Sequence, residues 1–114
     1  MELPTITDEF MLAMRPTARP YTLLLLRRTP KLADPDAFPT LWEHGRRNYA
    51  LREAGLLSIV CPMPDDDELA GIGIFNAGVD EVHQLMADDP AIRAGLLTYT
   101  VHTCHGFPGD ALPG

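Results

Sequence analysis

The sequence predicts an α+β fold in which a four-stranded antiparallel sheet carries two helices on one face. Three observations support this prediction. Four short apolar runs lie at residues 21–28, 56–61, 69–75 and 96–104, helical spacing follows the first and the third run, and turn residues mark the junctions. The resulting order, βαββαβ, is the split βαβ or ferredoxin-like arrangement.

The first strand and the first helix are set by a change of period. The run "YTLLLLRR" at residues 21–28 is apolar at successive positions, which predicts a strand buried on both faces. The proline-rich segment 29–39 ends it. A helix then begins at Asp36 or Thr40 and runs to Ala54, and its aromatic arc is expected to face the core. That arc and its neighbours are Phe38, Leu41, Trp42, Gly45 and Tyr49.

The second half of the sequence repeats the pattern. Residues 56–61 form a strand, residues 62–68 a turn, and "LAGIGIF" at residues 69–75 a third strand. Gly71 and Gly73 alternate with larger residues there and leave space for another backbone or a ligand, so both are candidate substrate-binding positions. The segment "AGVDEVHQLMA" has helical spacing, and the last strand alternates over residues 96–104.

Two aspartates stand directly before a proline in "MADDPAIRAG", residues 86–95. An Asp side chain is a favoured N-cap, and Pro90 suits the first position of a helix. Capping accounts for one acid, and Gly95 is expected to end the turn. Capping does not use the whole carboxylate, so a second contact for that acid stays open.

Composition limits the class of protein. Hydrophobic residues make up 46% and charged residues 22% of the 114 positions, as in an ordinary globular domain. We expect an N-terminal arm at residues 1–18, extended and without a sustained period, a domain at residues 19–105 and a C-terminal tail at residues 106–114. The net charge of −7 opposes nucleic-acid binding, and Arg46 with Arg47 is interpreted as a solvated surface pair.

The same composition favours a cytoplasmic protein. Two cysteines, Cys61 and Cys104, form neither a disulfide framework nor a metal motif. The N-terminus is acidic where a signal peptide is basic, and no apolar run is long enough to cross a bilayer, so we expect no membrane partner. Two helices cover only one face of an apolar sheet, which predicts that the other face pairs in a homodimer.

Two segments resemble the YCII-related (YciI-like) domain family. The first is "EHGRRNYALREAGLLSIVCPM" at residues 43–63, and the second is "VDEVHQLMADDPAIRAGLLTYTV" at residues 79–101. The resemblance implies a dimeric α+β barrel built from two ferredoxin-like sheets, and a His-Asp pair that falls on His44 and Asp89. Relatives in the wider group include isomerases, dehalogenating lyases and cofactor-free oxygenases. The ending "HTCHGFPGDALPG" and the longer arm depart from the family pattern.

These residues suit acid-base chemistry. An imidazole titrates near neutrality, and a carboxylate on its second nitrogen fixes the tautomer and stabilises the imidazolium. The resemblance implies the reaction class and the substrate class. Together with this chemistry it predicts a lyase or isomerase in which His44 is the general base on a small cyclic or aromatic-derived substrate, Asp89 orients it and Asn48 helps to position the substrate. The alternatives are a non-catalytic dimeric protein that binds a small ligand or serves a pathway, and a surface histidine beside a simple cap.

No cofactor or metal is expected. The sequence holds no glycine-rich phosphate loop, no nucleophile elbow and no dinucleotide fingerprint. The cluster "HTCH" at residues 102–105 lacks a further ligand at metal spacing, and "PDDDE" lacks the spacing and the glycine of a calcium loop.

Overall fold

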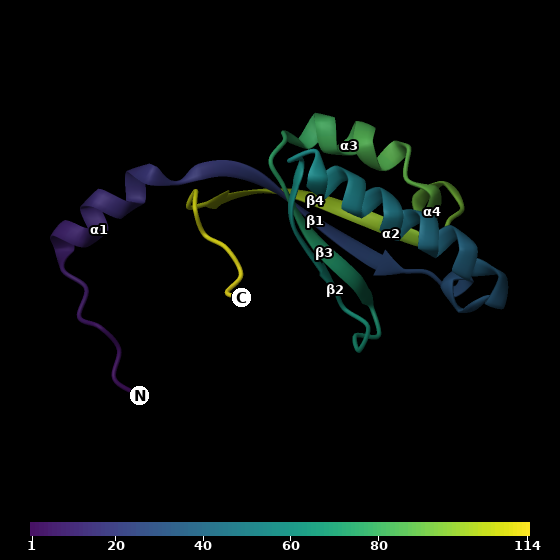
Figure 1. Ribbon diagram of the computed structural model, residues 1–114, viewed down its shortest axis with the longest axis horizontal. Helices are drawn as coiled ribbons and strands as arrows, with labels where there is room; N and C mark the ends of the chain where they lie inside the picture. Colours follow the sequence, from purple (N-terminus) through teal and green to yellow (C-terminus); the bar gives the residue numbers. More distant parts are fainter. The chain divides into compact units, whose positions relative to one another are not determined.

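The protein, described over residues 1–114 by a computed structural model, contains a four-stranded sheet with strand order β2-β3-β1-β4. The strands are β1 (Arg19–Arg28), β2 (Leu57–Pro62), β3 (Leu69–Phe75) and β4 (Leu97–Gly106). The α-helices are α1 (Asp8–Met14), α2 (Phe38–Glu53), α3 (Val79–Ala87) and α4 (Pro90–Arg93). Helices α2, α3 and α4 lie over the same face of the sheet (Figure 1). The predicted ferredoxin-like α+β fold is confirmed.

The sheet is buried on its helix-covered face. Strand β1 pairs antiparallel with β3, and Leu25 lies opposite Ile72. Side chains of β1 alternate strictly: Leu24 and Leu26 are buried, whereas Leu23 and Leu25 are only half-buried. The prediction that this strand is buried on both faces is therefore wrong for the single chain, because successive side chains of a strand point to opposite faces and the helices cover only one.

The core lies between this face and the helices. Phe75 of β3, Leu57 of β2, and Val82 and Met86 of α3 are each no more than 2% exposed. Each such apolar side chain contributes about 1.5–3 kcal/mol when it leaves water. A Cβ built on Gly73 would lie 3.0 Å from Leu57 Cδ1, so the glycine is needed for this close packing.

Helix α2 turns a different side to the core than the sequence predicts. Its aromatic side chains point outward, and Phe38, Trp42 and Tyr49 are 65%, 60% and 65% exposed. The rings of Phe38 and Trp42 pack on one another with centroids 6.0 Å apart. The buried residue of α2 is Leu51, and His44 lies seven positions earlier on the same side of the helix. The expectation that these aromatic side chains face the core is therefore wrong, whereas Leu41 of the same arc packs against the core.

The two ends of α2 and the end of α4 follow the sequence signals. Pro39 lies in the first turn of α2, where a missing backbone N–H is tolerated. Gly55 and Gly95 adopt φ values of 78° and 73°, which are left-handed and suit glycine after a helix end. The predicted helix ends at Gly55 and Gly95 are confirmed.

The turn between β2 and β3 is held by hydrogen bonds to Asp66. The backbone N–H groups of Leu69 and Glu68 donate to its carboxylate and lower the pKa of Asp66. Arg28 donates to the carbonyl oxygens of Asp66 and Met63, which joins the end of β1 to this turn. The acidic run of residues 65–68 therefore forms a hydrogen-bonded turn.

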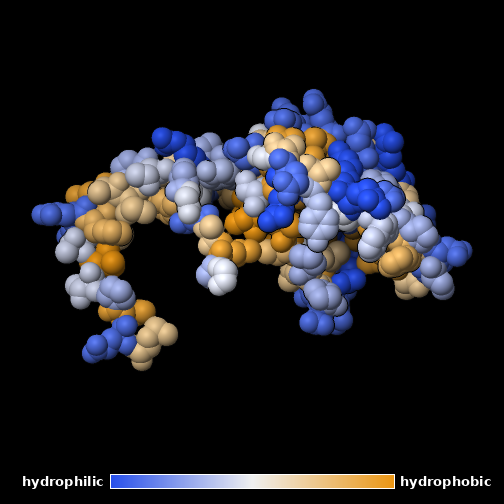
Figure 2. All heavy atoms as spheres, in the orientation of Figure 1, coloured by the Kyte–Doolittle hydropathy of each residue, from blue (hydrophilic) through white to orange (hydrophobic).

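The chain divides into two units, Tyr21–Cys104 and Met1–Pro20 with His105–Gly114. The second unit contains α1, where we expected an extended arm. The Thr7 hydroxyl accepts a hydrogen bond of 3.1 Å from the Phe10 N–H, and Asp8 and Glu9 occupy the favourable first turn. None of the residues of α1 is buried, and hydrophobic residues, coloured orange and tan in Figure 2, lie along its surface.

Candidate active site

Asp89 is fixed by the start of α4. As the N-cap, its Oδ2 accepts hydrogen bonds of 3.0 Å from the Ala91 N–H and 3.2 Å from the Ile92 N–H, and Pro90 occupies the first helical position. The Asp89 residue is 0% exposed. A buried carboxylate is stable only when its oxygens are hydrogen-bonded, and the cap supplies two of its donors. The predicted capping role is confirmed.

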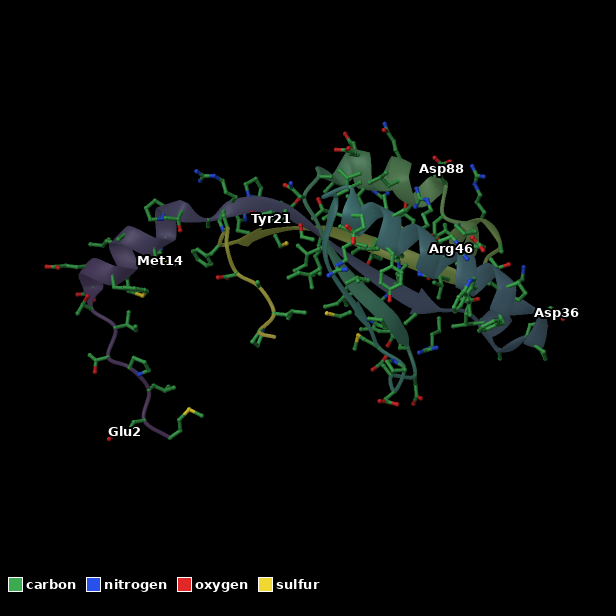
Figure 3. All side chains as sticks on the ribbon, in the orientation of Figure 1. Glu2, Met14, Tyr21, Asp36, Arg46 and Asp88 are labelled. Atoms are coloured by element: carbon green, nitrogen blue, oxygen red, sulfur yellow. The ribbon has the colours of Figure 1, made fainter.

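Its neighbour Asp88 lies in a different environment. The Asp88 side chain is 68% exposed and pairs with Arg93 Nη2 at 2.8 Å. It lies at the outer surface between α3 and α4 (Figure 3). Of the two acids before the proline, therefore, only Asp89 faces the interior.

His44 meets the buried carboxylate from α2. Its Nδ1 lies 2.8 Å from Asp89 Oδ1 and 3.0 Å from Oδ2, and its side chain is 12% exposed. A carboxylate in its ionised form only accepts hydrogen bonds, and Nδ1 is then the donor. In the neutral ring the lone pair therefore lies on Nε2, which is the tautomer that a general base oriented by a carboxylate requires.

Asn48 occupies the other ring nitrogen. It lies one helical turn after His44, and its Nδ2 lies 3.2 Å from His44 Nε2. The amide donates to the lone pair of the neutral ring. After rotation of the amide by a half-turn, its Oδ1 accepts from the N–H of an imidazolium. Asn48 can therefore hydrogen-bond to both protonation states of His44, and it must release Nε2 before a substrate can reach that atom.

Arg47 completes the group and was missed. Its Nη1 lies 4.0 Å from Asp89 Oδ1, its side chain is 23% exposed, and Nη1 is buried without a hydrogen-bond partner. The interpretation of Arg47 as a solvated surface residue is therefore wrong. The signal was present in the sequence, because positions 44, 47, 48 and 51 share one face of a helix.

Gly71 and Gly73 lie on β3 and pack against residues of β2. The atoms nearest to a Cβ built on Gly73 belong to Leu57, Ile59 and Phe75, and the nearest to one on Gly71 is the Cys61 carbonyl oxygen at 3.0 Å. The protein's own atoms fill the space beside both glycines. Their role in substrate binding stays a prediction.

The candidate metal ligands do not gather into a second site. No three His, Cys, Asp or Glu side chains lie where they could hold a metal ion. His83 contacts the Tyr99 hydroxyl at 2.8 Å, and His102 Nε2 lies 3.1 Å from Thr100 Oγ1. None of the helices has the length and apolar character that crossing a bilayer requires.

Comparisons with known proteins support the fold. No protein-family model and no curated protein sequence matches the chain. Among solved structures it is similar to 5-chloro-2-hydroxyhydroquinone dehydrochlorinase, TftG, from Burkholderia phenoliruptrix AC1100, in complex with 2,5-dihydroxybenzoquinone. The TM-score is 0.56 at 23% identity, over 72% of this chain and 90% of that one. The two proteins share a fold.

Proposed function

We propose that the protein is a small lyase or isomerase in which His44 is the general base and Asp89 holds its ring. The observation that carries the proposal is the 2.8 Å contact between His44 Nδ1 and a wholly buried carboxylate. A histidine on a wetted helix surface would not need such a partner. A dehydrochlorinase, itself a lyase, has the same fold, and this supports the proposal that the chain is a small enzyme. We also propose that the chain belongs to the YCII-related family.

The proposed step is a proton transfer. His44 Nε2 takes a proton from an O–H or an acidic C–H of the substrate, and the electron pair of that bond stays on the substrate as an enolate or phenolate. Asp89 remains ionised and stabilises the imidazolium through Nδ1. The proton then returns to another atom of the substrate in an isomerase, or the electron pair expels a leaving group in a lyase. Neither outcome needs an organic cofactor or a metal.

The contact between Asn48 and His44 favours one alternative function. In this alternative, the chain is a dimeric cytoplasmic protein that binds a small ligand without converting it. Its amide occupies the only free nitrogen of the His44 ring, as in a histidine held for binding rather than for proton transfer. The two functions differ in the fate of the ligand. A binding protein returns its ligand unchanged, whereas an enzyme releases halide or a rearranged product.

The test uses compounds related to the ligand and substrate of the structural neighbour. We expect the wild-type protein to convert a chlorinated hydroxyhydroquinone, followed by halide release and by absorbance, and His44→Gln to be slower by at least about 100-fold, because general bases contribute that much or more. His83→Gln is the matched control, since His83 is an exposed helical histidine. Equal rates in the wild type and His44→Gln would remove the base from the proposal.

The proposal includes a homodimer that covers the free face of the sheet. Leu25 and Ile72 are paired neighbours on β1 and β3, and both point away from the helices and are half-buried. A leucine and an isoleucine exposed to water at the centre of a sheet face are unfavourable. A second copy of the chain supplies a matching apolar face that covers them.

A lysine in the centre of this face is expected to separate the protomers. Ile72→Lys places an unpaired charge in the interface and weakens dimerisation by at least about 100-fold. Sedimentation velocity over a concentration series measures this effect. Ala50→Lys, on the exposed surface of α2, is the control and should leave a dimer. A wild-type protein that sediments as a monomer at every concentration would contradict the dimer.

A further inference from the structure

Arg47 carries a donor that the protein itself does not use. The Nη1 group is buried, has no hydrogen-bond partner and lies 4.0 Å from Asp89 Oδ1, beyond hydrogen-bond reach. Buried charged donors are nearly always paired, because an unpaired one loses its water without compensation. An arginine held in this way needs an explanation that the protein fold does not supply.

Asp89 does not provide that explanation. Its two oxygens already accept from the Ala91 and Ile92 N–H groups and from His44 Nδ1, at 2.8 to 3.2 Å. Arg47 therefore adds positive charge beside the carboxylate without completing its hydrogen bonds. The guanidinium is also partly open, since 23% of the Arg47 side chain is exposed.

The positions of the three polar residues on α2 connect this donor to the base. His44, Arg47 and Asn48 are each half-buried and lie within four positions of one another on the side of the helix that faces Asp89. A molecule that displaces Asn48 from His44 Nε2 therefore lies on the same side of α2 as the Arg47 guanidinium. Guanidinium groups bind oxyanions with charge-assisted and often paired hydrogen bonds.

We propose that Arg47 binds the substrate oxygen that becomes anionic when His44 removes its proton, so that the substrate class is an acidic enol, a hydroxyquinone or a polyhydroxylated phenol. This inference rests on the proposed function and names its substrate class. Before the reaction, Asp89 and Arg47 carry opposite charges and the His44 ring is neutral. When His44 takes the proton, one positive charge forms on the ring and one negative charge on the substrate, and Arg47 stabilises that oxygen.

The experiment compares two probes that differ in charge. 2,5-Dihydroxybenzoquinone has acidic hydroxyls, and 2,5-dimethoxybenzoquinone has methyl ethers in their place. Binding of each is measured by calorimetry at pH 7.5 to the wild type, Arg47→Gln and Arg46→Gln. Arg46 is the matched control, because it lies on the exposed side of α2 and pairs with Glu43 at 3.2 Å. Thermal melting shows that each variant is folded.

We expect Arg47→Gln to lower the affinity for the dihydroxy probe by about 10- to 100-fold, which is the contribution of a charge-assisted hydrogen bond. The affinity for the dimethoxy probe should change by less than about twofold. Arg46→Gln should change neither, and Arg47→Lys should recover part of the lost affinity. An equal loss for both probes, no loss for either, or no binding of the dihydroxy probe to the wild type at 1 mM would each overturn the inference.

The two proposals can fail separately. If the wild type binds the dihydroxy probe through Arg47 but converts no chlorinated hydroxyhydroquinone, the proposed enzyme activity is disproved and the anion-binding role of Arg47 stands. If the wild type converts the substrate and Arg47→Gln has the same rate, the proposed enzyme activity stands and Arg47 has no part in it.

Discussion

Asp89→Asn should lower turnover by about 10³- to 10⁴-fold while the protein stays folded, because it reverses the tautomer of His44. The backbone N–H groups of Ala91 and Ile92 require an acceptor, so the oxygen of the new amide faces them. Its NH₂ group then faces His44 and donates to Nδ1. The ring proton moves to Nε2, and the lone pair that should accept the substrate proton is lost.

Two measurements separate this cause from a general disturbance. The ¹⁵N shifts of the His44 ring report which nitrogen carries the proton, and they should exchange between the wild type and Asp89→Asn. Asp88→Asn is the control, because Asp88 is exposed and contacts Arg93 and not the ring. A variant with the reversed tautomer and full turnover would show that His44 is not the base. Unchanged ¹⁵N shifts would show that the carboxylate does not set the tautomer.

The position of Asp89 could be predicted largely from local sequence signals, whereas the position of His44 could not. The cap, the proline and the closing glycine are local signals within residues 88–95, and each acts through nearby backbone groups. The contact between His44 and Asp89 spans 45 positions and cannot be obtained from local spacing. It follows from topology only in outline, because the predicted fold puts both helical segments over one face of the sheet.

The side chains of α2 show why the rest could not be predicted. Hydropathy places aromatic residues inside and charged residues outside, and this helix does the opposite at several positions. Trp42 and Tyr49 are exposed, whereas Arg47 and Asn48 are half-buried beside His44. His44 turns inward because it hydrogen-bonds to a buried carboxylate from another segment, and Asn48 follows as a partner of the His44 ring. Hydropathy does not record either partner.

Helix α1 was missed for a different reason. The segment Asp8–Met14 lacks a buried side, so it has no apolar period against a core from which a helix could be recognised. Its start nevertheless carries a local signal, a threonine followed by two acids, which the structure uses as a cap. A capping side chain stands at the start of α1, at Thr7, and at the start of α4, at Asp89.

Asp89→Ala should destabilise the domain by about 1.5–5 kcal/mol, a large effect for one side chain. The substitution removes the N-cap of α4, worth about 0.5–2 kcal/mol, and leaves a buried donor on His44 without an acceptor, which costs about 1–3 kcal/mol. Arg47 also loses the only negative charge within 4.0 Å that pairs with it. Urea denaturation at pH 7, followed by circular dichroism, measures the free energy of unfolding.

Asp88→Ala provides the comparison, since it removes an acid from the adjacent position and changes the free energy of unfolding by no more than about 0.5 kcal/mol. Asp89→Asn should lie between the two, because the new amide keeps an acceptor for the cap and a partner for the ring. If Asp88→Ala and Asp89→Ala had equal effects, the carboxylate of Asp89 would not be buried against His44. The cap and the orienting contact depend on one side chain, so stability and turnover must both respond to its loss, and only Asp89→Asn separates them.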